Sequence, residues 1–164
     1  MKRIGLGLLL GGLSTQAYGG SDIGTENACG LGAVLGQPTG LSGKCYIKGR
    51  RFGWDALVAY EFYPNNIGAL YVHSTAQWHP TELIEEDWGN ISWYFGVGPY
   101  VGLVSSGITS NSSLFAGVRA PVGINIDFAE YPVQAFVELA VSVNLFPSTA
   151  RVAPGGGIGA RYYF

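Results

Sequence analysis

The stretch of sequence that decides the fold is Gly157-Ile158-Gly159-Ala160-Arg161-Tyr162-Tyr163-Phe164. In an extended chain, successive side chains point to opposite faces, so one face here holds Ile158, Ala160, Tyr162 and Phe164. The other face holds Gly157, Gly159, Arg161 and Tyr163. An apolar face that ends in aromatic residues, opposite a face of small residues and a charge, is typical of the last strand of an outer-membrane β-barrel. We therefore predict a barrel with lipid on one face of its wall and a polar lumen on the other.

The beginning of the chain has the features of a secretory signal. Met1-Lys2-Arg3 is basic, the run from Ile4 to Leu13 is apolar, and Ala17-Tyr18-Gly19 places small residues two positions apart. A membrane helix needs about twenty apolar residues, and this run has about half of that. We predict a cleaved signal peptide over residues 1–19 and one outer-membrane barrel domain over residues 20–164.

The composition narrows the class further. The chain has 26 glycines, 13% aromatic and 48% hydrophobic residues, but only 12% charged residues, whereas charged residues make up about 25% of an average soluble domain. After the signal there is no apolar stretch long enough to form a transmembrane helix. The hydrophobic residues are instead spread over short alternating segments. This favours a transmembrane barrel over a helical membrane protein. The net charge of −2 is uninformative about partners, and because no basic cluster is present, nucleic acid is not an expected partner.

Alternation with period two predicts eight antiparallel strands, each close to the length that crosses a bilayer. We expect them at 27–36, 41–48, 54–63, 69–78, 90–103, 114–128, 133–144 and 157–164. The acidic connection 79–89, the Ser/Gly/Asn-rich connection 105–113 and the connection 147–156 separate strands.

The face opposite the apolar one distinguishes a membrane barrel from a soluble β-sandwich. The outer face of a soluble sandwich is rich in Lys, Glu and Thr, and its inner face is apolar. Here the second face carries mainly glycine, serine and aromatic residues, with isolated charges. Small residues leave space and polar residues can pair in the narrow lumen of an eight-stranded barrel.

Five charged residues are expected to point into the lumen. Since isolated buried charges are very costly, we predict that they pair in a structural network. Arg119 and Glu138 lie on neighbouring strands and form a natural pair. The complete predicted set is Lys44, Glu61, Arg119, Glu138 and Arg161.

Catalysis is not expected. Some barrels of this size modify lipid A with a histidine and a serine that share one face, but His73 and Ser74 are adjacent and lie on opposite faces. We interpret His73 as a lumen residue bonded to its neighbours, and His79 as an interfacial or turn residue. No metal or cofactor is expected, because the cysteines and histidines lack any ligand spacing.

Cys29 and Cys45 fall on the outward faces of the first two strands, and an exported chain permits a disulfide between them. A direct bridge would centre the hairpin on Gln37, which the Pro38-Thr39 turn does not favour without a bulge. The sequence leaves this disulfide open.

Three segments resemble a group of small bacterial outer-membrane barrels. Residues 30–44, GLGAVLGQPTGLSGK, match its opening pattern GxGxxxGxPTGxxxK, and residues 117–124 and 136–164 match later segments. Spirochaete members of this poorly characterised group are similar to the OmpA transmembrane domain. The resemblance implies an OmpA-like eight-stranded barrel, but it carries little information on function.

These observations predict a monomeric protein of the bacterial outer membrane whose partners are membrane lipid and, during insertion, the barrel-assembly machinery. By similarity with such proteins, Tyr162 and Phe164 are expected to act as its C-terminal insertion signal. If both termini are periplasmic, the acidic connection 79–89 faces the periplasm, and 105–113 and 147–156 face outside. We consider three roles: a structural or envelope-interaction barrel, a narrow pore for ions or small solutes, and a lipid A-modifying enzyme.

Overall fold

The structure is a computed structural model that describes residues 23–24, 29–47, 49–63, 67–106, 112–147 and 151–164. The predicted signal peptide, residues 1–19, lies outside the described residues. Among the described residues there is no helix long and apolar enough to cross a membrane. The strands are β1 (Cys29–Gln37), β2 (Thr39–Ile47), β3 (Phe52–Tyr63), β4 (Ile67–Trp78), β5 (Glu82–Glu86), β6 (Gly89–Ser106), β7 (Ser112–Phe128), β8 (Val133–Phe146) and β9 (Arg151–Tyr163).

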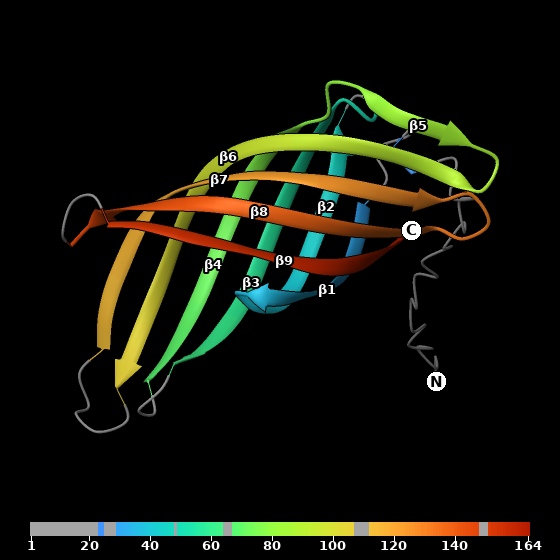
Figure 1. Ribbon diagram of the computed structural model, residues 1–164. Coiled ribbons are helices and arrows are strands. Elements are labelled where there is room, and N and C mark those ends of the chain that lie inside the picture. Colours follow the sequence, from blue (N-terminus) through green and yellow to red (C-terminus); the bar gives the residue numbers. More distant parts are fainter. Residues whose placement is uncertain (1–22, 25–28, 48, 64–66, 107–111, 148–150) are drawn as a thin grey trace, which may run out of the picture.

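Within this described part of the chain, eight strands form a closed antiparallel barrel (Figure 1). Strands β1 to β4 pair in sequence, β6 to β9 pair in sequence, and β1–β9 and β4–β6 pairings join the two halves. The remaining strand, β5, is not one of these eight. It pairs with the first residues of β6 and extends the wall beyond the end of β4. The predicted all-β, eight-stranded fold is therefore confirmed.

The alternation of the sequence becomes an apolar outer surface and a polar interior. In β8, Val137, Leu139 and Val141 lie on the outer face, and Leu139 is 66% exposed. The alternate residues Gln134 and Glu138 are buried inside the barrel. Such an apolar surface is stable against hydrocarbon, because each of the eight strands of the closed barrel pairs with two neighbours.

Two predicted connections contain strand structure. The acidic connection 79–89 holds β5, and the connection 147–156 holds the first six residues of β9, which begins at Arg151. Beyond Gln37 at the end of β1, β9 pairs only with β8, so Pro154 lies on an edge where the missing N–H of proline is tolerated. The glycine-rich composition of this segment hid the strand from sequence analysis.

The described ends of the chain lie together at one end of the barrel. The backbone N–H of Phe164 donates to the carbonyl oxygen of Cys29 over 3.0 Å. Strand β5 lies at this end too, and β1, β3, β6 and β8 end at the other (Figure 1). The fold thus places the acidic segment on the same side as the termini, as the sequence predicts.

Candidate functional site

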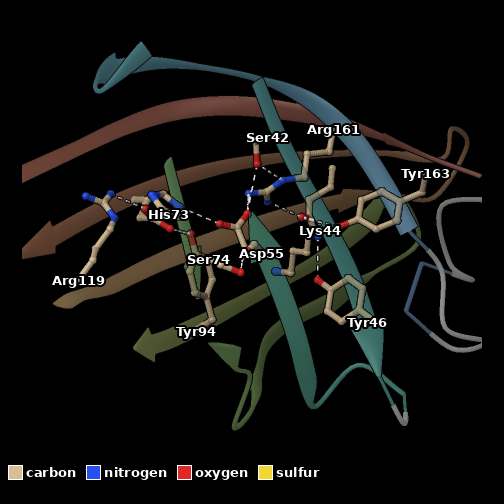
Figure 2. Close-up of polar contacts among 12 residues, drawn as sticks. Ser42, Lys44, Tyr46, Asp55, His73, Ser74, Tyr94, Arg119, Arg161 and Tyr163 are labelled. Atoms are coloured by element: carbon tan, nitrogen blue, oxygen red, sulfur yellow. Dashed lines mark hydrogen bonds and ion pairs between the residues drawn. The ribbon is translucent and has the colours of Figure 1, made fainter. Parts of the chain in front are cut away.

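The interior of the barrel holds a buried ion pair that joins two opposite parts of the wall. Arg161 of β9 contacts Asp55 of β3 through Nη2 and Oδ2, 2.6 Å apart. The Nε atom of Arg161 also donates to Ser42 Oγ over 2.9 Å. His73 Nε2 lies 3.1 Å from the second carboxylate oxygen, Oδ1. The Asp55 carboxylate therefore links β2, β4 and β9 across the lumen (Figure 2).

A second buried pair lies nearer the end opposite the termini. Arg119 Nη2 of β7 lies 2.8 Å from Glu138 Oε1 of β8, the pairing expected from their neighbouring strands. The other carboxylate oxygen accepts a hydrogen bond from the hydroxyl of Tyr94 over 2.7 Å. Both oxygens of Glu138 are therefore engaged.

Lys44 has a different environment from the two arginines. Its Nζ atom lies 2.8 Å from His79 Nε2 and 4.7 and 4.8 Å from the ring centroids of Tyr46 and Tyr94. Burial, followed by the ammonium of Lys44, lowers the pKa of His79 from 6.5 to about 2. The imidazole is therefore neutral at neutral pH, and its Nε2 accepts the hydrogen bond from Lys44.

Gln134 connects these groups at the end of the lumen near the termini. Its amide nitrogen donates to the Tyr46 hydroxyl over 2.9 Å and to Asp127 Oδ1 over 2.7 Å. Its amide oxygen accepts from Tyr163 over 3.0 Å and from Arg161 Nη1 over 3.2 Å. This one side chain thus uses both donors and its acceptor within the lumen.

Four of the five charged residues predicted to point into the lumen are buried there, and one is not. Lys44, Arg119, Glu138 and Arg161 are buried in the lumen. Glu61 does not lie near a strand centre as predicted; it is half-buried towards the end of β3 and lines a cavity there. The reason is the length of β3, which begins at Phe52 and so places its middle near Leu57.

Asp55, Asp127 and His79 belong to the polar network of the lumen, but the sequence did not predict them as members of it. Asp55 has the same parity as Leu57 and Ala59, so its inward direction was visible, but it stands beside the turn before β3. His79 was expected at an interface or turn, and it does lie in the connection after β4, but its side chain is buried. It follows β4 but continues the inward series of His73, Thr75 and Gln77.

Cys29 and Cys45 form a disulfide between β1 and β2. They are direct cross-strand partners, and the pairing continues without a bulge from Cys29↔Cys45 to Val34↔Gly40. The hairpin is thus centred on Gln37. The prediction that the Pro38-Thr39 turn would not favour this pairing without a bulge is therefore wrong. Thr39 Oγ1 closes the turn by donating to the Gly36 carbonyl over 2.9 Å and accepting from the Gly36 N–H over 3.1 Å.

The last residues of β9 divide as the alternation predicts. Tyr162 and the following Phe164 lie on the outer surface, whereas Tyr163 is fully buried in the lumen. Tyr163 packs with Tyr46 and Ile23 at the end of the barrel near the termini. The outward pair is thus placed to contact lipid, and its role as an insertion signal stays a prediction.

Two cavities enter the barrel from its ends. The cavity at the end away from the termini has a volume of about 900 Å³, and the one near the termini has a volume of about 320 Å³. A third cavity of only about 10 Å³ lies among Asp55, Arg161, Arg119 and Glu138. The two ion pairs thus occupy the part of the lumen between the large openings.

Serine and histidine do not come together as a nucleophile and its base in the described residues. Ser74 Oγ accepts a hydrogen bond from Trp54 Nε1 over 2.6 Å, and His73 points to the opposite, inner face. Inside the lumen, Ser42 Oγ donates to Asp55 Oδ2 over 3.2 Å, and His73 contacts the same carboxylate. Nucleophilic catalysis requires contact between the hydroxyl and the imidazole instead.

Taken together, a closed antiparallel wall with an apolar outer face and a polar, ion-paired interior defines an eight-stranded OmpA-like transmembrane β-barrel. The structure of the N-terminal β-barrel domain of OprF from Pseudomonas aeruginosa is similar to it, with a TM-score of 0.62 and 12% sequence identity, over 84% of this chain and 98% of that chain. At this identity, the likeness concerns the fold alone.

Two further solved structures show weaker likeness. Ail, the attachment invasion locus protein of Yersinia pestis, has a TM-score of 0.43 and 17% identity, over 84% of this chain and 95% of that chain. Neisserial surface protein A has a TM-score of 0.46 and 11% identity, over the same shares. No protein-family model and no curated protein matches the chain.

Proposed function

We propose that the protein is an integral outer-membrane barrel that does not conduct and that serves as a structural and envelope-interaction component. The observation that carries this proposal is the filled centre of the lumen. The ion pairs Arg161–Asp55 and Arg119–Glu138 are buried there, and the space between them that a water molecule could enter is only about 10 Å³. Charges held in this way fill the narrow bore of an eight-stranded barrel.

The conductance of the refolded protein in a planar bilayer tests this role. We expect no steady unitary currents from the wild-type protein, while a porin inserted in the same bilayer gives its usual steps. Steady unitary currents would contradict the proposal that the barrel does not conduct. They would instead support a narrow passage for ions or small solutes.

That second function has a specific observation in its favour. The cavity of about 900 Å³ reaches Arg119, and the small residual cavity is lined by all four members of the two ion pairs. A passage through the lumen would require these ion pairs to separate. A passage of this kind would conduct only small ions.

The location in the bacterial outer membrane and the insertion route belong to the same proposal. The apolar outer face supports direct contact with lipid, and Tyr162 and Phe164 at the end of β9 are placed for recognition by the barrel-assembly machinery. We expect the protein in outer-membrane fractions as a monomeric band that shifts on heating, and Phe164→Ala should lower the amount of that band. Extraction with soluble periplasmic proteins and no heat shift would overturn the location.

A catalytic role is not part of the proposal. The separation of Ser74 from His73 and the engagement of Ser42 by Asp55 support this view. Lipid A from cells with and without the protein should give the same mass profile. A new acyl pattern that depends on the protein would contradict the proposal.

A further inference from the structure

The cavity at the end away from the termini has the properties of a binding site. Its volume of about 900 Å³ falls in the range of about 300–1,000 Å³ that small-molecule sites occupy. It is lined by aromatic side chains on one side and by Arg119 at its inner end. A structural role for the barrel does not require a hollow of this composition.

Three rings from neighbouring strands form one side of the cavity. Tyr71 of β4 stacks on Tyr100 of β6 with centroids 5.3 Å apart and planes at 28°. Phe115 of β7 follows at 6.1 Å from Tyr100. We call Tyr71, Tyr100 and Phe115 the aromatic wall.

Glycines let these rings lie close to the barrel wall. A Cβ atom at Gly102 would stand 2.1 Å from the ring of Phe115, and one at Gly117 would stand 2.9 Å from the ring of Tyr100. The hydroxyl of Tyr100 also donates a hydrogen bond to Asn144 Oδ1. The rings are therefore held against the wall, which leaves the cavity beside them open.

Arg119 has donors that its ion pair does not use. Its side chain is almost fully buried and meets Glu138 through Nη2 alone. Its Nε atom is buried and has no hydrogen-bond partner, and the hydroxyl of Tyr71 lies within reach of Arg119 and Ser142. Nη1 lies 3.5 Å from the Cβ position of Gly155, a residue that lines the cavity, so the missing side chain there leaves room beside the guanidinium.

The charges around the cavity favour an anion. Among the described residues, Arg119 and Arg151 line it together with one carboxylate, Glu61. Glu138 does not line the cavity, and its two oxygens bind Arg119 and Tyr94. A guanidinium with free N–H groups binds a carboxylate through short, charge-assisted hydrogen bonds.

We propose that this cavity binds a small planar aromatic molecule that carries a carboxylate. The ring of the ligand stacks beside the aromatic wall, and its carboxylate accepts hydrogen bonds from Arg119 at the inner end of the cavity. Aromatic rings prefer such offset or tilted contacts, and a largely desolvated charge pair adds selectivity for the anion. This site does not depend on whether the lumen conducts.

The test uses 2-naphthoate as the probe and the full-length barrel in lipid nanodiscs. Nuclear magnetic resonance follows the ring signals of tyrosine and phenylalanine residues during titration, with empty nanodiscs as the control for partition into lipid. We expect saturable binding at one site that shifts the signals of the aromatic wall. The uncharged 2-naphthalenemethanol should bind about 10- to 100-fold more weakly, because it lacks a charge-assisted hydrogen bond.

Two variants locate the site. Phe115→Ala removes one ring of the aromatic wall and should weaken 2-naphthoate binding about 3- to 10-fold. Val118→Ala, on the same strand but on the outer surface, is the matched control and should leave binding unchanged. The double variant Arg119→Gln/Glu138→Gln removes both charges of this ion pair, so neither charge is left buried without its partner. Its preference for 2-naphthoate over the alcohol should disappear.

Several outcomes would overturn the site. Equal binding of 2-naphthoate and the alcohol to the wild-type barrel would remove the role of Arg119. Equal effects of Phe115→Ala and Val118→Ala would place the probe in the lipid rather than in the cavity. If the double variant fails to fold, the first comparison and the Phe115 variant still decide the question.

Discussion

The two halves of the lumen differ although the same strands build both. Near the termini, β9 places Arg161 and Tyr163 inside, and these long side chains meet Asp55, Gln134 and their neighbours. Towards the other end, β9 carries the small residues of the segment 153–157, which line the cavity of about 900 Å³ or lie beside it. The size of the inward residues therefore decides where a narrow barrel is filled and where it is hollow.

The largest expected effect is a difference in stability between two variants. One loses a carboxylate from the filled half of the lumen, and the other loses a carboxylate from the hollow half. Asp55→Ala leaves Arg161 buried without its partner and should lower the free energy of unfolding by about 3–5 kcal/mol. Glu61→Ala, on the same strand at the open end, should cost at most about 1 kcal/mol. Urea unfolding of the refolded barrel in detergent micelles measures both.

A third variant controls for the loss of side-chain volume. Asp55→Leu combined with Arg161→Met removes both charges and keeps apolar volume, so its cost should be well below that of Asp55→Ala. Equal costs for Asp55→Ala and Glu61→Ala would show that the two halves do not differ in the way their contacts indicate.

The disulfide gives the next largest effect, at the end of the barrel that is filled. Cys29 and Cys45 are 16 residues apart in sequence, and opening a loop of this length lowers the free energy of unfolding by about 3 kcal/mol. The double variant Cys29→Ser/Cys45→Ser should show this loss in urea unfolding. The wild-type protein should lose the same amount in reductant, and the double variant should not respond to it.

A pH-dependent effect of smaller size is expected from His79. Its pKa is lowered from 6.5 to about 2 by burial and by Lys44. Between these values the unfolded chain binds a proton that the folded barrel excludes, so stability is present above pH 6.5 and falls as the pH falls. The slope approaches about 1.4 kcal/mol per pH unit below 6.5.

Comparison with His79→Gln isolates this contribution. Unfolding in urea at pH 7.5 and pH 5.0 should show a larger loss for the wild-type barrel than for the variant, which has no imidazole to protonate. If both lose the same stability, other groups cause the pH dependence, and the neutral state of His79 in the folded barrel would be refuted.

Much of the fold could be predicted because a barrel wall repeats one rule. The alternation along β8 and along the last eight residues of the chain fixes the faces of those strands, and the apolar residues on their outer faces indicate contact with lipid. The Arg119–Glu138 contact was predictable because both residues lie on the inner faces of neighbouring strands, although the register places Arg119 opposite Ser142 and Glu138 opposite Gly123. Strand limits were harder, since the glycine-rich start of β9 has the composition of a loop.

The sequence by itself determined the class of protein, the direction in which each side chain points and the neighbours along the sheet. The tertiary structure alone decided which groups meet across the lumen. Arg161 finds Asp55 and Lys44 finds His79 because closure of the sheet sets the strand stagger and the height of each residue. The hollow beside the aromatic wall has the same origin, because its volume depends on side chains that only the closed barrel brings together.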